Sequence, residues 1–233
     1  MLTNITVEIM LKIKPSDIVE LIGTFFLTAV VIGSGIMAEN LSQGNDAVAL
    51  LGNTISTGAI LFVLIKSFSS ISGAHFNPVV SFIFFIKKEL TLSTFLKYII
   101  FQFLGALLSV LVVHYYFDQQ LIQISANFRG EEKLLISEIV ATFGLLTTIL
   151  FVRKYNPKDV ASAVALFISA GYWFTSSTSF ANPAVTIARM FTDTFTGIGP
   201  ASVIYFIIGQ IFGALLAKYS YKKLAVGIFD NFR

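Results

Sequence analysis

Phe180-Ala181-Asn182-Pro183-Ala184-Val185-Thr186 is the stretch that decides the fold, and Ala74-His75-Phe76-Asn77-Pro78-Val79-Val80 is its twin in the first half of the chain. In both, an Asn that is a favoured N-cap precedes a Pro that suits the first position of a helix. Polar helix starts inside a bilayer are tolerated only where they line a cavity or are buried in protein. One such start in each half of a membrane chain indicates a pathway built from an inverted repeat.

The composition is that of a polytopic membrane protein. Of 233 residues, 55% are hydrophobic and 12% are charged, and the mean hydropathy of +0.81 is too high for a soluble domain of this length. There is no Cys, so disulfides and thiolate metal sites are excluded, and we expect no metal and no cofactor. The net charge of +3 is modest, and no nucleic-acid partner is expected.

Six segments are predicted to span the membrane, at residues 15–38, 47–66, 91–116, 134–152, 160–174 and 200–221. Two shorter apolar segments, 77–86 and 182–191, follow a Ser/Gly-rich loop at 67–76 and a Ser/Thr-rich loop at 175–181. Ten residues of helix reach ~15 Å, half of a ~30 Å hydrocarbon core, so the short segments are predicted to be re-entrant or interfacial. The fold class is therefore an all-α membrane protein.

The two halves of the chain match residue by residue. Glu20-Leu21-Ile22-Gly23-Thr24-Phe25 pairs with Glu138-Ile139-Val140-Ala141-Thr142-Phe143, and Gln102-Phe103-Leu104-Gly105-Ala106 pairs with Gln210-Ile211-Phe212-Gly213-Ala214. We predict one domain, 1–233, with repeats at 15–116 and 133–222. Three spans per repeat is an odd number, so the second repeat enters the membrane from the opposite side.

The basic residues predict the orientation of the chain. With the N-terminus inside, 13 of the 16 Lys and Arg lie on the cytoplasmic side, and only Arg129, Lys133 and Arg189 lie outside. Both termini are therefore expected in the cytoplasm. Residues 1–14 lack the apolar core of a signal peptide, and the short termini without a transit peptide favour a bacterial inner membrane.

These motifs resemble the two signature loops of the aquaporin, or major intrinsic protein, family. The resemblance rests on Ser72-Gly73-Ala74-His75-Phe76-Asn77-Pro78-Val79, on Asn182-Pro183-Ala184, and on the paired Glu and Gln-x-x-Gly-Ala positions, and it covers about 15–222. It implies six spans, two half-helices that meet at mid-membrane, one pore per subunit, and a homotetramer in the lipid bilayer. The first motif departs from the usual pattern with Val79 in place of Ala.

Such a pore accepts neutral solutes and repels cations and protons. Two helix N-termini that meet bring two positive dipole ends, each roughly +0.5 charge, to one place. The amides of Asn77 and Asn182 can donate hydrogen bonds to a passing oxygen. We therefore predict a passive channel for water and small neutral solutes, and no enzyme activity. For a single motif, the alternative is that the Asn only caps its helix.

The second loop departs from the family at the position that sets selectivity. Most members have an Arg directly after the second Asn-Pro-Ala, where this chain has Val185, and Arg189 comes ~6 Å further along the helix. By spacing, the other filter positions are Thr57, Ala170 (or Gly171) and Ser179. The predicted filter is small and uncharged, which favours glycerol, urea or metalloid hydroxides such as arsenous acid. Arg189 is expected in the outer vestibule, or alternatively extended to the interface.

The buried carboxylates Glu20 and Glu138 need partners. The resemblance implies that each accepts backbone N–H groups of a re-entrant loop. Proton transport, or for Glu20 a capping box opened by Asp17, are the alternatives. His75 is expected to brace its loop rather than bind a metal. Besides the solute channel, a strict water channel and a secondary transporter with broken helices stay open, whereas the spans offer no cluster for a membrane enzyme. The physiological solute and any gating are not predicted.

Overall fold

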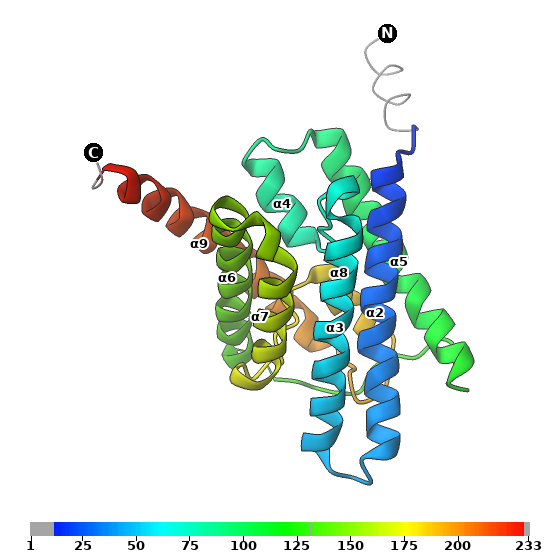
Figure 1. Cartoon of the computed structure of the whole chain (residues 1–233). Helices are drawn as coiled ribbons and strands as arrows, with labels where there is room; N and C mark the ends of the chain where they lie inside the picture. The colour runs from blue at the N-terminus through cyan, green and yellow to red at the C-terminus, as the bar shows by residue number, and fades with distance from the viewer. Residues whose placement is uncertain (1–11, 131, 231–233) are drawn as a thin grey trace.

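The computed structural model describes residues 12–130 and 132–230, with side chains as far as residue 225, and within these residues all regular structure is helical. The first half contains α2 (Pro15–Leu41), α3 (Asp46–Ser72), α4 (Pro78–Ile86) and α5 (Leu92–Tyr116). Helix α2 packs along both α3 and α5. In Figure 1, α2 and α3 run side by side and α5 crosses α2 obliquely. Most of the segment 1–14, which lacks the apolar core of a signal peptide, lies outside the described residues.

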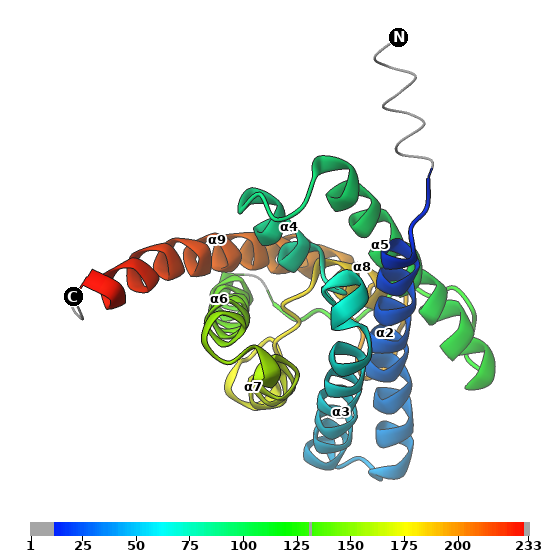
Figure 2. The same cartoon turned by 45° about the horizontal axis from the view of Figure 1, so that its top comes forward.

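The second half repeats this arrangement. It contains α6 (Glu132–Tyr155), the short 3₁₀ helix η1 (Pro157–Asp159), α7 (Val160–Phe174), α8 (Pro183–Arg189) and α9 (Pro200–Asp230). Helix α6 packs along α9 and α7, and α7 closes the bundle against α3 (Figure 2). Glycines allow the closest approaches: a Cβ on Gly213 of α9 would lie 2.9 Å from Phe143 N of α6.

Five helices of the described chain are long and apolar enough to cross a membrane: α2, α3, α5, α6 and α9. Helix α7, which was predicted as the fifth span over the same residues 160–174, has 15 residues and is ~22 Å long. The outward faces of these helices carry large exposed hydrophobic side chains, as a lipid-facing surface requires.

The two short helices hold the halves together. Helix α4 has 9 residues (~14 Å) and α8 has 7 (~10 Å), so neither can span. They touch each other, and each also packs on a long helix of the opposite half, α4 on α9 and α8 on α5. The largest buried cluster accordingly mixes residues of both halves, including Val79 and Val80 with Ala181 and Val185.

Three local predictions require correction. Helix α3 continues through 67–72, which was predicted as loop, because Gly73 with φ +87° is the residue that ends it. Helix α9 extends beyond the predicted end at 221 to Asp230. Asp17 does not open a capping box with Glu20; its Oδ2 accepts the N–H of Lys14 at 2.8 Å, and the same carboxylate pairs with Lys97 at 3.0 Å.

Candidate permeation site

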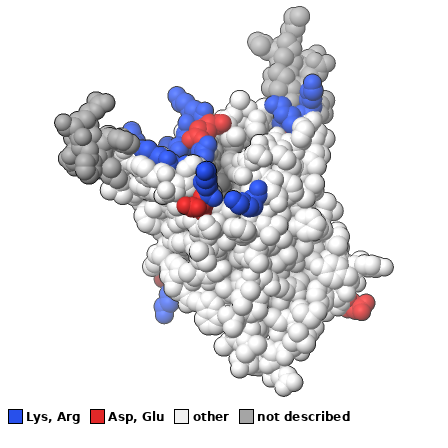
Figure 3. Space-filling model, in the orientation of Figure 1, with Lys and Arg blue, Asp and Glu red and all other residues white. Residues whose placement is uncertain are grey.

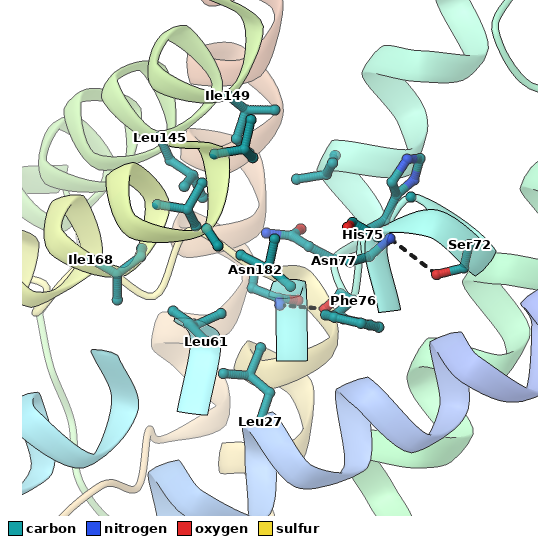
Figure 4. A pocket seen from close by; sticks show the side chains of 18 of the residues that line it. Leu27, Leu61, Ser72, His75, Phe76, Asn77, Leu145, Ile149, Ile168 and Asn182 are labelled. Carbon is teal, nitrogen blue, oxygen red and sulfur yellow. Dashed lines mark hydrogen bonds between the residues drawn. The ribbon is translucent and has the colours of Figure 1, made fainter. Parts of the chain in front are cut away.

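Two asparagines meet where the short helices begin. Each caps its own helix: Asn77 Oδ1 accepts Val79 N–H at 3.0 Å, and Asn182 Oδ1 accepts Ala184 N–H at 3.0 Å. Each also reaches the opposite loop, because Asn77 Nδ2 donates to Ala181 O at 2.7 Å and Asn182 Nδ2 donates to Phe76 O at 2.9 Å. The two side chains lie next to each other in Figure 4. An amide NH₂ has two N–H donors, so each Asn keeps one for another acceptor.

The loops before the two Asn residues share an unusual backbone. The residues three and one before each Asn have left-handed φ: Ala74 (53°) and Phe76 (48°) in one loop, Ser179 (51°) and Ala181 (45°) in the other. Non-glycine residues seldom adopt this conformation, and they do so where the surroundings enforce it. The repetition shows that both loops are built in the same strained way.

Buried carboxylates enforce this loop conformation. Glu20 is fully buried, and its oxygens accept the N–H groups of His75 at 3.0 Å and Phe76 at 2.6 Å, together with the hydroxyl of Ser72. Glu138 is fully buried as well, and it accepts the N–H groups of Phe180 at 3.0 Å and Ala181 at 2.8 Å. Both carboxylates thus lie behind the loops and turn their backbone N–H groups away from the site.

A glutamine completes each network. Gln102 Nε2 donates to Glu20 Oε2 at 2.7 Å and to Ser81 Oγ at 2.9 Å. In the second half, Gln210 Nε2 donates to Glu138 Oε2 at 2.7 Å and to Thr186 Oγ1 at 2.9 Å. Each glutamine therefore ties a long helix to a carboxylate and to the short helix beside it.

A cavity of about 560 Å³ passes the two asparagines. Leu27, Leu61 and Ile168 lie across from them in Figure 4 and form part of an apolar wall. At the end of the molecule that carries both chain termini, the lining includes Lys66, Arg153 and Lys158, and at the other end it includes Thr57, Tyr172 and Arg189. The site is an elongated passage with an apolar side and a side of loop backbone and amides.

The predicted filter residues are only partly brought together. Thr57, Ser179 and Val185 line the cavity and are at most 4% exposed. Ala170 does not belong with them, because it is exposed on the outer face of α7. The alternative at this position, Gly171, is buried, and a Cβ on it would lie 2.7 Å from Ser179 Cβ. The residues of α7 that line the cavity are Val160, Ala161, Val164, Ile168 and Tyr172, and Tyr172 was missed although its spacing from Ile168 is one helical turn.

Tyr172 lines the passage at the end away from the chain termini. Its hydroxyl lies 3.1 Å from Thr57 Oγ1, so α7 and α3 are joined by a hydrogen bond at this level. Ser179 Oγ, which is also buried in the lining, has no hydrogen-bond partner within the described chain. Buried hydroxyls without partners are uncommon, so Ser179 is a ready donor and acceptor for a passing solute.

Arg189 is inside the protein rather than extended to the membrane interface. It is 3% exposed, its Nε donates to Thr196 O, and its guanidinium carbon lies 3.5 Å from the centroid of the Phe180 ring. Arg129, which comes from the segment between the two halves, lies 5.4 Å from the same ring. Sequence reasoning placed both arginines outside but did not foresee that they converge on Phe180.

His75 lies at the opposite end of the site from Arg189. Its Nδ1 is 3.0 Å from Ser81 Oγ, and its ring packs 4.7 Å from Phe84 and 5.5 Å from Tyr98. The described residues contain no group of three or more His, Cys, Asp or Glu that could hold a metal ion. The ring contacts and the hydroxyl contact position His75 within its loop.

Fold and site together define an α-helical membrane channel with two re-entrant half-helices. The family model described as Major intrinsic protein matches residues 10–170, more than half of the sequence. The chain belongs to the major intrinsic protein family, whose members are passive channels for water and small solutes and not enzymes.

Individual relatives agree with this assignment. The aquaglyceroporin AqpS of Rhizobium meliloti (strain 1021) is 46% identical over 200 residues, which cover 86% of this chain and 85% of the relative. Aquaporin PIP2-7 of Arabidopsis thaliana is 28% identical, covering 93% of this chain and 84% of its own length. The X-ray structure of the aquaglyceroporin from Plasmodium falciparum shares the fold, with a TM-score of 0.74 at 22% identity over 92% of this chain and 98% of that one.

Proposed function

We propose that this channel passes water together with larger neutral solutes: glycerol, urea and neutral metalloid hydroxides such as arsenous acid. One observation carries the proposal. Asn77 and Asn182 each use one N–H to bind the opposite loop and keep a second beside a largely apolar wall. A neutral molecule with a hydroxyl oxygen can replace its hydrogen bond to water with one from that amide N–H. A cation is repelled, because the amide N–H groups and the two helix N-termini all present positive charge to it.

The solute range follows from the side chains at the outer end. Val185 stands where most family members carry an Arg, and Thr57 and Ser179 are small hydroxyl residues. Together they offer two hydroxyls and an apolar surface, which suits a polyol better than a single water molecule. The relative AqpS is named an aquaglyceroporin, which supports a solute range wider than water.

We further propose that the channel is a homotetramer in a bacterial inner membrane, with both termini in the cytoplasm. Lys and Arg gather at the end of the molecule that carries both termini, whereas most of the rest of the visible surface is uncharged (Figure 3). This is the asymmetry of the positive-inside rule. Exposed apolar faces on α2, α3, α6 and α7 leave room for neighbouring subunits or lipid.

Stopped-flow light scattering on proteoliposomes tests the solute range. The natural chain should pass glycerol, urea and arsenite as well as water. Val185→Arg should reduce glycerol and arsenite flux more than water flux, and Val185→Leu separates added size from added charge. A natural chain that passes only water is a strict water channel, and the proposed range is then wrong. Saturable flux coupled to an ion gradient would instead identify a secondary transporter.

A further inference from the structure

Arg189 is a buried cation that forms no ion pair with a carboxylate of the described residues. The ion pairs within the described chain are Lys87–Glu89, Lys97–Asp17 and Arg153–Glu89, and Arg189 takes part in none of them. Glu138 is the acidic group beneath the same loop, but its oxygens are engaged by Phe180 N, Ala181 N and Gln210 Nε2. An unpaired buried charge is costly and is retained at functional positions in membrane proteins.

The surroundings fix this cation in place. The loop after α8 folds back, since Ile198 N donates to Arg189 O at 3.1 Å, and it presents Thr196 O to Arg189 Nε. Arg129 secures the same loop, donating from Nε to Gly197 O at 2.7 Å and from Nη2 to Phe195 O at 3.1 Å. Three consecutive carbonyls are thus bound by two guanidinium groups that both lie near the Phe180 ring.

The rest of the Arg189 guanidinium is left for a solute. Its only hydrogen bond to another described residue is the one from Nε, and a guanidinium has five N–H donors. Arg189 lies one turn after Val185 on α8, so the two residues share the face that lines the cavity. The unpartnered hydroxyl of Ser179 belongs to the same lining.

The first half of the chain has a neutral pair in the equivalent place. Arg189 comes seven residues after Asn182, and Phe84 comes seven residues after Asn77. Phe84 stacks on His75 at 4.7 Å, as Arg189 stacks on Phe180 at 3.5 Å, and each partner precedes its Asn by two residues. The repeat therefore supplies a stacking position, and only the second half fills it with a charged residue. In the first half a guanidinium from another helix, that of Arg153, lies 4.6 Å from the centroid of the Phe84 ring, but its charge is paired with Glu89.

We propose that Arg189 sets the charge selectivity of the outer constriction, in place of the arginine missing at Val185, and that Phe180 and Arg129 are the residues that position it. Its free N–H groups bind solute oxygens, and its charge raises the barrier for cations. The inference rests on the proposed channel function. It adds the residue that excludes cations from a filter in which the usual arginine position holds the apolar Val185.

The test compares Arg189→Met with Arg189→Lys in proteoliposomes. Sodium and proton fluxes are followed with entrapped dyes, and water and glycerol fluxes by light scattering. Removing a charge close to the path should raise cation flux on the order of 10- to 100-fold, the effect of one unit charge several ångströms away at an effective dielectric constant of about 20. Water flux should stay within about twofold, and Arg189→Lys should retain most of the exclusion.

Controls separate position from charge. Lys133→Met removes an exposed cation from α6 and should leave all fluxes unchanged. Arg129→Met should raise cation flux by a smaller factor than Arg189→Met, because it loosens the loop without removing the charge at the cavity. If Arg189→Met does not fold, Arg189→Gln, whose amide can still donate to Thr196 O, should show the same rise.

The outcomes distinguish the inference from the function it rests on. Cation flux unchanged in a folded Arg189→Met or Arg189→Gln, with normal water flux, overturns the role of Arg189 and leaves the channel function intact. A natural chain that passes neither water nor glycerol overturns the channel function, and the inference with it.

Discussion

Replacing Glu138 by Gln tests whether a buried carboxylate holds the second re-entrant loop. Oε1 of Glu138 accepts Phe180 N–H at 3.0 Å, and Oε2 accepts Ala181 N–H at 2.8 Å and Gln210 Nε2 at 2.7 Å. A Gln side chain has nearly the same shape but only one acceptor oxygen, so its NH₂ group must face another donor. The loop then loses a bond that its left-handed residues require.

The expected loss follows from these three bonds. A hydrogen bond to a charged group contributes ~1.5–3 kcal/mol, and a neutral one ~0.5–1.5 kcal/mol. If the Gln oxygen replaces Oε2, two bonds survive in weaker form and the Phe180 N–H is left unpaired. One lost bond at ~2 kcal/mol and two weakened bonds at ~1 kcal/mol each lower the free energy of unfolding by about 4 kcal/mol.

Thermal unfolding in detergent, followed by circular dichroism, measures this loss. A change of that size should lower the Tm by about 8–16 °C in a chain of this length. Glu132→Gln, an exposed change at the start of the same helix, should alter stability by less than about 0.5 kcal/mol. Glycerol flux in proteoliposomes should fall for Glu138→Gln alone. A Tm within about 2 °C of the natural chain would refute the reasoning and show that the loop is held by other contacts.

Three further changes probe other parts of the passage. Tyr172→Phe removes the hydroxyl that lies 3.1 Å from Thr57 Oγ1 and joins α7 to α3 across the passage. Glycerol flux should rise by roughly fivefold, the equivalent of losing one ~1 kcal/mol hydrogen bond, and an unchanged or lower flux in the stopped-flow assay contradicts this. Gly213→Ala places a Cβ 2.9 Å from the backbone nitrogen of Phe143 and should cost ~1–3 kcal/mol in thermal unfolding. Gly33→Ala meets side-chain atoms of Phe117 and Tyr116 at 3.3 Å and of Val113 at 3.7 Å and should cost less, so equal losses would count against the packing argument. Although partial burial opposes the shift, hydrogen bonds from Arg153 and Lys87 hold the pKa of Glu89 below its usual range. The stabilisation from ionised Glu89 is therefore present above the ordinary carboxyl pKa and is lost as the pH falls through the lowered pKa of Glu89. The natural chain should have a higher Tm than Glu89→Gln at pH 7 and should lose that advantage in acid. A Tm difference that does not depend on pH would rule out the ion pair as its source.

The sequence predicted the features that depend on local chemistry. An Asn-Pro pair is a helix start wherever it occurs, so the beginnings of α4 and α8 followed directly from Asn77 and Asn182. Helix α7 has the predicted bounds 160–174 because turn residues flank an apolar run on both sides. The Ser residues at 67–72 favour a loop, but Gly73 is the stronger stop signal, and α3 continues to it.

The outer filter could not be predicted from spacing alone. Successive residues of a helix point about 100° apart, so an error of one or two positions in counting turns a side chain from the cavity to the lipid. Ala170 is such a case: it is exposed, whereas its neighbour Gly171 is buried against Ser179, and Tyr172 lines the cavity. Counting along the chain cannot settle the rotation of α7, which is set by its packing on α3 and α6.

The position of Arg189 depends on contacts between segments far apart in the sequence. Its carbonyl partner Thr196 is held by a loop that Arg129 binds from more than 60 residues away, and its ring partner Phe180 is positioned by Glu138. The local sequence predicts none of these pairings, because an Arg near the predicted outer face is equally compatible with a side chain that extends to the membrane interface.

The repeat separates scaffold from selectivity. Both halves build the scaffold of the passage from the same residue types: an Asn that donates to the opposite loop, a Glu behind the loop, and a Gln that joins this Glu to the short helix. A symmetric scaffold alone would give both ends of the passage the same preference among solutes. We propose that the difference in solute preference arises where the repeat is broken, at Phe84 on His75 in one half and Arg189 on Phe180 in the other. Exchanging the stacked side chains should therefore alter which solutes pass without dismantling the passage, whereas exchanging the scaffold residues should dismantle it.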